Sequence, residues 1–299
     1  MKRRITALLA ALLLLAAAAP AGAELKSALL TEVALTGLEE GNPFALRYEQ
    51  LTGTHIEPLF PQGVPYFFGG IGGKWGKGWF FASYPYYHKK ICEHGSDFFV
   101  EGQVYLYGLD CAGFLRYVYI NAGRYPPPTI TEITTSVKTQ AGHVFPAGTE
   151  MPAFDRLKDT LEPGDLLAIR HREAHYGHIM MYIGTLRDFG YTAEDEPELA
   201  PYLDYPLVIH CGTSPFYGER FQKLIDESHG RYRRCLTTDG GVAVSIVGVD
   251  PEAAPVHVHV QQTDFDLFEM KDGGYQLTVI NMNDLEACVW YRQDPESGR

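Results

Sequence analysis

One cysteine of this chain lies in a sequence context that can support nucleophilic chemistry. Cys111 follows Asp110 in the stretch YGLDCAGFLRYVY, and apolar residues at positions 114, 115, 118 and 119 predict a helix that begins at the cysteine. The first turn of a helix carries unpaired backbone N–H groups and the positive end of the helix dipole, and both favour the thiolate form. Gly113 would let main-chain donors approach a reaction intermediate closely. The simpler alternative is a packing role, which is commoner for a lone cysteine on an apolar helix.

Two histidines lie further along the chain, on neighbouring predicted strands. His178 begins the apolar run 178–183, and His210 lies within the run 207–211. Strands that follow one another in the sequence usually pair, so we expect the two imidazoles side by side, facing the start of the helix. A thiol nucleophile needs a base, and the base needs an orienting group. Taken alone, each histidine is more simply explained as a satisfied core or surface residue.

The elements that must position these residues indicate an α+β fold. Helical patterns occupy the start of segment 24–60 and residues 44–51, whereas 71–103 is rich in glycine and aromatic residues without a clear period, which predicts a long packed loop. The predicted strands are 166–169, 178–183, 207–211, 242–249, 256–261, 265–270 and 275–282. Helices followed by a series of antiparallel-looking strands are typical of an α+β domain rather than of a doubly wound sheet.

Residues 1–23 have the pattern of a signal peptide. A basic start, the apolar run 5–19 and the small-x-small sequence Ala21-Gly22-Ala23 follow one another in that order. We therefore expect cleavage after Ala23, a secreted or cell-envelope protein, and no membrane span in the mature chain. An uncleaved N-terminal anchor is the alternative.

Charge and composition argue against several partners. The formal net charge is −12, and removal of Lys2, Arg3 and Arg4 with the leader would make it −15. A chain this acidic has no long-range attraction for nucleic acid or an anionic membrane, so we expect neither as a partner. His257 and His259 alternate on one predicted strand as metal ligands can, but no third ligand accompanies them. We expect no metal and no other cofactor, and the sequence leaves the oligomeric state open.

The chain has five cysteines, which is an odd number for an exported protein. Export permits disulfides, but at least one thiol must then lack an intramolecular partner. The four besides Cys111 could form two bridges in three ways or none at all, and the sequence does not choose; they are Cys92, Cys211, Cys235 and Cys288. Cys211 follows His210 on a strand, so its side chain should point to the opposite face and make it a poor second nucleophile.

Five segments in order along the chain resemble the motifs of the NlpC family of bacterial cell-wall cysteine peptidases, which have a papain-like fold. They are YFFGG at 66–70, LDCAGF at 109–114, LEPGDLL at 161–167, GHIMMYIG at 177–184 and VIHC at 208–211. The DCAGF and GHIMMYIG elements are the most specific. The resemblance implies a catalytic domain over 61–250, after a helical segment over 24–60. Residues 251–299 would be either a β-rich extension or further strands of the same domain.

Position by position, the resemblance implies that Cys111 is the nucleophile, His178 the general base and His210 the residue that orients the base. The residues matching the oxyanion or substrate-binding positions are Tyr66, Asp110 and Ala112. The implied reaction is hydrolysis of amide bonds in peptidoglycan stem peptides, of the γ-D-glutamyl-diamino acid type, through a thioester on Cys111 and without a metal. An acyltransferase with the same thiol chemistry and a non-catalytic cell-wall-binding module are the alternatives.

Three features depart from the family pattern. Ala112 stands where the family commonly has serine. Tyr66 lies 45 positions before Cys111 because of an aromatic insertion, and His178 lies 32 positions before His210 because of an acidic insertion. Since both insertions join motif segments, we expect both to rim the cleft. The first could stack on a substrate or pack on itself, and the second could attract a free amine or be a solvated loop.

Overall fold

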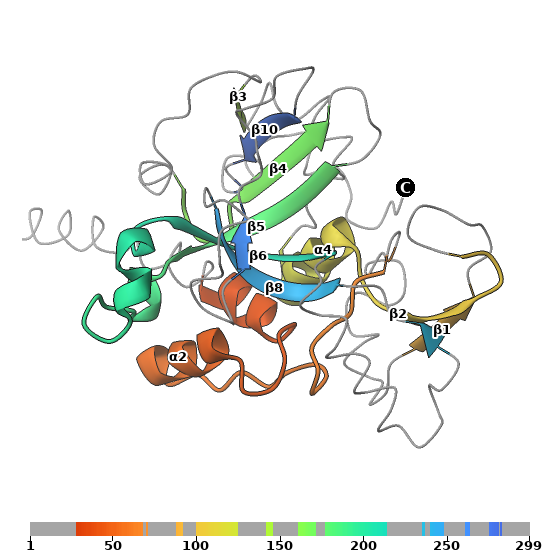
Figure 1. Ribbon diagram of the computed structural model, residues 1–299, viewed down its shortest axis with the longest axis horizontal. Helices are drawn as coiled ribbons and strands as arrows, with labels where there is room; N and C mark the ends of the chain where they lie inside the picture. The colour runs from red at the N-terminus through yellow and green to blue at the C-terminus, as the bar shows by residue number, and fades with distance from the viewer. Residues whose placement is uncertain are drawn as a thin grey trace, which may run out of the picture.

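A computed structural model describes the parts of the chain that carry the sheet and its helices (Figure 1). The described residues are 28–67, 70, 88–91, 100–124, 142–145, 161–171, 177–213, 235–236, 240–247, 261–263, 275–280 and 282. The leader 1–23, most of the aromatic insertion, the predicted strand 265–270 and the His257–His259 pair lie outside them.

The helices begin where the sequence supplies a cap. Residues 28–35 are helical, and α2 (Pro43–Thr52) starts at Asn42, whose side chain accepts a hydrogen bond from the N–H of Phe44. The helix α4 (Cys111–Asn121) starts at Asp110, whose Oδ1 lies 2.6 Å from the backbone nitrogen of Gly113. The predicted helices 44–51 and 111–121 are therefore confirmed, and the nucleophile candidate is the first residue of α4.

A seven-stranded sheet forms the centre of the molecule. Its order is β3 (Gly142–Phe145), β10 (Tyr275–Ile280), β4 (Leu166–His171), β5 (Gly177–Thr185), β6 (Pro206–Thr213), β8 (Gly240–Val247) and β9 (Gln261–Thr263). Every neighbouring pair is antiparallel except β8 and β9, which are parallel. The α+β prediction is confirmed.

Several predicted strands are present with slightly different bounds. The runs 166–169, 178–183, 207–211 and 242–249 correspond to β4, β5, β6 and β8. The C-terminal run 275–282 supplies β10, which lies between β3 and β4 in the same sheet. Residues after 250 thus contribute strands to the central sheet, while the domain boundaries at 23, 60 and 250 stay predictions.

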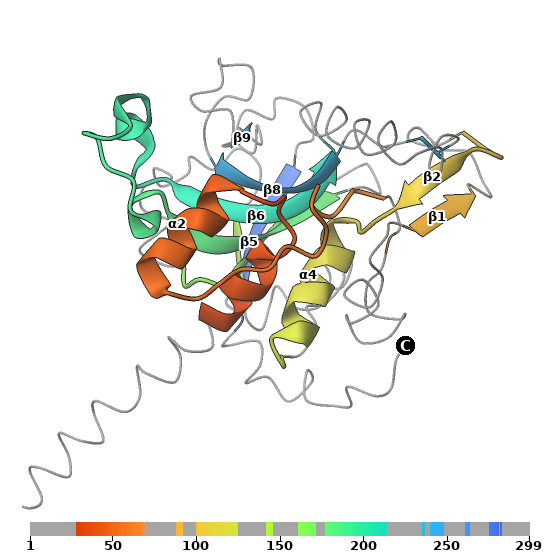
Figure 2. The same ribbon diagram turned by 90° about the horizontal axis from the view of Figure 1, so that it is seen from below.

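The predicted loop 71–103 is wrong at one place. Residues 88–91 form β1 (His88–Ile91), which pairs antiparallel with β2 (Val104–Tyr107), and β2 pairs in parallel with β7 (Cys235–Leu236). The neighbouring strand β2 supplies the backbone partners of β1, and the sequence HKKI has no period that could predict a strand. Figures 1 and 2 show this small sheet standing to one side of the main one.

One face of the central sheet is covered by helices. In Figure 2, α2 and α4 lie on the same side of β5, β6 and β8. The turn after helix 28–35 contacts α4 closely, because a Cβ at Gly37 in this turn would lie 2.8 Å from a ring carbon of Phe114 on α4. Tyr119 of α4 donates a hydrogen bond from its hydroxyl to the carbonyl of Gly164. The N-terminal helical segment therefore packs in the same core as the nucleophile helix.

The PGD turn before β4 has a structural role. Asp165 is buried, and its Oδ2 accepts a hydrogen bond from the N–H of Glu162. Its Oδ1 accepts a second from the N–H of Met282, just after β10. This carboxylate closes the turn and ties the C-terminal strand to the start of β4.

The acidic insertion lies against α2. It contains two short 3₁₀ helices, η3 (Arg187–Phe189) and η4 (Pro197–Tyr202). The guanidinium of Arg47 on α2 lies 3.8 Å from the ring centroid of Tyr191 and donates hydrogen bonds to the carbonyl of Gly190 and the carboxylate of Glu196. The insertion therefore packs on α2 through these contacts, while its residues Glu194, Asp195 and Glu198 are exposed to solvent, as expected for a solvated loop.

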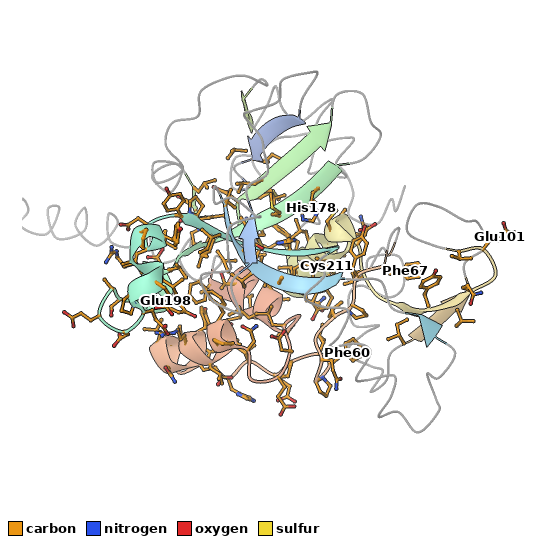
Figure 3. The ribbon with its side chains drawn as sticks, viewed as in Figure 1. Phe60, Phe67, Glu101, His178, Glu198 and Cys211 are labelled. Atoms are coloured by element: carbon orange, nitrogen blue, oxygen red, sulfur yellow. The ribbon has the colours of Figure 1, made fainter. Side chains whose placement is uncertain are left out.

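Its position corrects the expectation that both insertions rim the cleft. The insertion leaves β5 after Thr185, whereas His178 lies near the opposite end of that strand. Seven residues of extended chain span roughly 23 Å at about 3.3 Å each. Figure 3 shows Glu198 of the insertion far from His178. The prediction failed because the insertion is adjacent to two motifs in the sequence but not in space. The length of β5 separates His178, at one end of the strand, from the insertion at the other end.

Candidate active site

Backbone hydrogen bonds hold the chain segment that precedes Cys111. The N–H of Phe67 donates to the carbonyl of Leu109, the N–H of Leu109 to that of Pro65, and the N–H of Asp110 to that of Gly70. Between them, a Cβ at Gly108 would lie only 1.8 Å from the Pro65 carbonyl oxygen, so only glycine fits there. The YFFGG motif therefore serves to fix the chain that leads into α4.

The thiol of Cys111 lies where α4 meets β5. The backbone N–H of Ile179, which belongs to the peptide bond that follows His178, is near enough to the sulfur to lower the pKa of the thiol. The N–H groups of Ala112 and of Cys111 itself act on this pKa in the same direction. The residue is buried, with 8% of its surface exposed, and its thiol is free.

Burial decides the protonation state of this thiol. It raises the pKa of Cys111 to about 12, and the neighbouring carboxylate of Asp110 acts in the same direction. The three backbone donors lower the pKa but do not compensate. The larger thiolate fraction expected from the helix start is therefore not found, because removal of the thiol from water outweighs the effect of the helix start.

The two predicted histidines lie side by side. The Nε2 of His178 is 2.9 Å from the Nδ1 of His210, and the ring centroids are 4.8 Å apart with the planes at 86°. The strands β5 and β6 that carry them are antiparallel neighbours, as predicted. Since Nε2 of His178 faces His210, Nδ1 is the ring nitrogen that does not take part in this contact.

A serine that the sequence analysis did not single out extends this pair. The Nε2 of His210 lies 2.8 Å from the Oγ of Ser245 on β8, and both residues are buried. The polar row therefore crosses three adjacent strands in the order β5, β6, β8. The sequence feature that could have indicated Ser245 is its position as a lone serine within the apolar run VAVSIV.

Both imidazoles are neutral in this site. Burial lowers the pKa of His178 to about 4. It also lowers the pKa of His210 well below its ordinary value, and the neighbouring His178 acts in the same direction. The resting site is accordingly a neutral thiol beside a neutral imidazole pair.

Gly212 is a second residue that the sequence analysis missed. A Cβ at this position would lie 3.1 Å from Cε1 of His178 and 3.2 Å from Nδ1 of His210. Both contacts are tighter than ordinary van der Waals separation. The absence of a side chain at Gly212 therefore lets the two rings approach each other.

The three remaining candidates surround Cys111 in different ways. Tyr66 is buried, and burial together with nearby Cys111 raises the pKa of its hydroxyl, which thus keeps a proton to donate. Ala112 is half-buried, and its backbone N–H lowers the pKa of the Cys111 thiol. Asp110 caps α4, and its carboxylate is an acceptor that cannot donate to an oxyanion.

Cys211 faces away from the histidine pair. Its thiol is free and fully buried, and it lies 3.2 Å from the carbonyl oxygen of Leu109 (Figure 3 labels this residue). Its neighbour His210 points to the other face of β6, as the alternation of a strand requires. Cys92, Cys235 and Cys288 have no described side chain, so their pairing stays open.

The described residues contain no group of three or more histidine, cysteine, aspartate or glutamate side chains that could hold a metal ion. Within the same part of the chain, none of the helices is both long and apolar enough to cross a membrane.

A cysteine at the start of a helix that packs on an antiparallel sheet, with a histidine on the adjoining strand, defines the papain-like class of fold. Residues 63–195 match the model of the NlpC/P60 family. The family consists in general of cysteine peptidases and related hydrolases of the cell wall. The matched segment includes Cys111 and His178 and ends before His210. Searches of curated proteins and of solved structures gave no match.

Proposed function

We propose that this protein is a cysteine hydrolase that cleaves amide bonds in peptidoglycan stem peptides, of the γ-D-glutamyl-diamino acid type. The observation that carries the proposal is the position of the Cys111 thiol against the His178–Ile179 peptide, with His178 hydrogen-bonded on its far side to His210. A nucleophile, a base and an orienting group thus come from one helix and two strands. The match of residues 63–195 to the NlpC/P60 family model supports the choice of a wall substrate.

The proposed reaction begins with proton transfer. Because both partners are neutral at rest, Nδ1 of His178 removes the thiol proton of Cys111 as the sulfur attacks the amide carbonyl carbon. The tetrahedral intermediate collapses when the C–N bond breaks, and His178 returns the proton to the leaving amine. The acyl group remains on Cys111 as a thioester.

In the hydrolysis of the thioester, His178 acts as a base toward water and the sulfur becomes the leaving group. His178 removes a proton from water, the oxygen attacks the thioester carbonyl, and the C–S bond breaks. The proton then returns to the sulfur, so the products are a carboxylic acid and the free thiol. His210 holds the His178 ring in place through both half-reactions.

The oxyanion of each intermediate requires donors near the sulfur. The backbone N–H groups of Cys111 and Ala112 lie near the sulfur, and the nearby hydroxyl of Tyr66 remains protonated. We assign these three groups to the oxyanion site and the carboxylate of Asp110 to helix capping.

We also propose that the protein acts outside the cytoplasm, after cleavage of the leader at Ala23. The support is the basic, apolar and small-residue order of residues 1–23. Mass spectrometry of the protein recovered from the culture medium or the envelope fraction would test this, and an N-terminus at Met1 would contradict it.

The enzymatic proposal is tested with defined muropeptides. Wild-type protein is expected to release products whose masses match cleavage of the γ-D-glutamyl bond, and Cys111→Ala is expected to release none. Cys211→Ala is the matched control, since it removes another buried thiol that faces away from the histidines. Cleavage by Cys111→Ala at the wild-type rate, or no cleavage by either protein, would contradict the proposal. Products that carry an added amine in preference to water would instead identify an acyltransferase.

A further inference from the structure

We propose that Ser245 is a positioning residue that holds the histidine pair in the tautomers required for base catalysis. The inference rests on the proposed function only in taking Cys111 and His178 as nucleophile and base. No family motif points to Ser245, and it lies outside the segment 63–195 that matches the family model.

The three polar residues lie on one face of three neighbouring strands. Ser245 pairs in register with Val208, and His210 pairs with Ala243, so the serine and the histidine are diagonal neighbours across β6 and β8. The side chain of Ser245 is fully buried and that of His210 almost so. The serine oxygen at 2.8 Å is the group that faces Nε2 of His210.

Only two arrangements of protons satisfy this row. In the first, Nε2–H of His178 donates to Nδ1 of His210, and Nε2–H of His210 donates to the serine oxygen. In the second, the serine hydroxyl donates to His210, Nδ1–H of His210 donates to Nε2 of His178, and the proton of His178 is on Nδ1. The first leaves Nδ1 of His178 able to accept the thiol proton, and the second blocks it.

Ser245 stabilises the first arrangement because it supplies an acceptor for the outer N–H of His210. Without that oxygen, the competent arrangement contains a buried N–H with no acceptor, and such groups are rare in folded proteins. The serine also matters during the reaction. When His178 becomes an imidazolium, its charge is spread through His210 towards the serine oxygen, which stabilises the protonated base.

The tautomers can be read directly by ¹⁵N NMR of the imidazole rings. In wild-type protein near neutral pH we expect both His178 and His210 to carry their protons on Nε2. In Ser245→Ala we expect part or all of the population to move to the Nδ1 tautomers. Ser245→Thr keeps the hydroxyl and is expected to retain the wild-type tautomers. Nδ1 protonation of His210 in the wild type would overturn the proposal without need of any variant.

A second readout is the rate at which iodoacetamide alkylates Cys111, followed by peptide mapping. Ser245→Ala is expected to slow this rate about 10-fold at neutral pH, in line with one lost buried hydrogen bond. The control is Val247→Ala, which removes more volume from the same buried face of β8 and has no place in the polar row. Val247→Ala is expected to lower thermal stability and leave tautomers and alkylation unchanged.

Equal tautomers and equal alkylation rates in wild type and Ser245→Ala would contradict the role of Ser245. A matching loss of alkylation in Val247→Ala would show that the effect is one of packing, and would contradict it as well. Neither readout uses a cell-wall substrate. If the wild-type protein has the expected tautomers but does not cleave muropeptides, the proposed function is rejected and this inference still stands.

Discussion

The Nε2 atom of His178 lies 2.9 Å from the Nδ1 atom of His210, although 32 positions and the whole acidic insertion separate them in the sequence. The contact arises because β5 and β6 run antiparallel and because Gly212 has no side chain to hold the rings apart. The insertion joins the far ends of these strands, so its length does not disturb the pair.

The first prediction concerns the division of labour between the histidines. His178→Ala is expected to reduce kcat/KM on a muropeptide by about 10²–10⁴-fold, because the base that moves the proton is lost. His210→Ala is expected to reduce it less, since an orienting group acts through the base. Steady-state kinetics measure both, with circular dichroism to confirm folding. Activity of His210→Ala equal to wild type would show that another group orients His178.

The second prediction concerns acid stability. His178 and His210 have pKa values below 6.5 in the folded protein, so the unfolded chain takes up protons first as the pH falls. Stability should be full above pH 6.5 and decline towards pH 4, by at most about 1.4 kcal/mol per pH unit for each histidine. Urea unfolding at several pH values measures this decline.

The same experiment on His210→Gln supplies the control. This variant keeps a polar side chain and loses one titrating group, so its stability should decline less steeply over the same pH window. Identical slopes for the two proteins would mean that His210 is not held neutral in the folded state.

The third prediction concerns Gly212→Ala. The added methyl carbon would lie 3.1–3.2 Å from both imidazoles, and these short contacts can be relieved only if the rings move apart. We expect about a 10-fold or greater loss of kcat, with a smaller change in KM, because base positioning is impaired. Gly37→Ala is the matched control, since its methyl would meet Phe114 in the core, away from the histidines. Wild-type kcat in a folded Gly212→Ala protein would contradict the role of this glycine.

The fourth prediction separates the acidic insertion from catalysis. Arg47→Ala removes the stacking contact with Tyr191 and the hydrogen bonds to Gly190 and Glu196, at a cost of about 1–2 kcal/mol in stability. Hydrogen exchange should increase over residues 186–205, while kcat/KM changes by no more than about twofold because the sites are far apart. A strong fall in kcat/KM with unchanged exchange would contradict this placement.

Local patterns in the sequence were sufficient for the elements that carry the chemistry. The apolar spacing after Cys111 predicted the helix α4 and its start at the cysteine, because the side-chain period acts within one or two turns. The apolar runs around His178 and His210 predicted β5 and β6, and the alternation of a strand predicted that Cys211 would face away from His210. The α+β class and the resemblance to the NlpC family followed from these same segments.

Tertiary structure alone decided the rest, because it depends on contacts between distant segments. Burial of Cys111 beneath β5 reverses the thiolate expected at a helix start, and no window of sequence reports that dehydration. Strand register brings Ser245 to His210 and Gly212 to both imidazoles, across 35 positions in the case of the serine. The length of β5 places the acidic insertion at the far end of the sheet. Sequence determined which side chains are available, and the pairing of strands determined which of them meet.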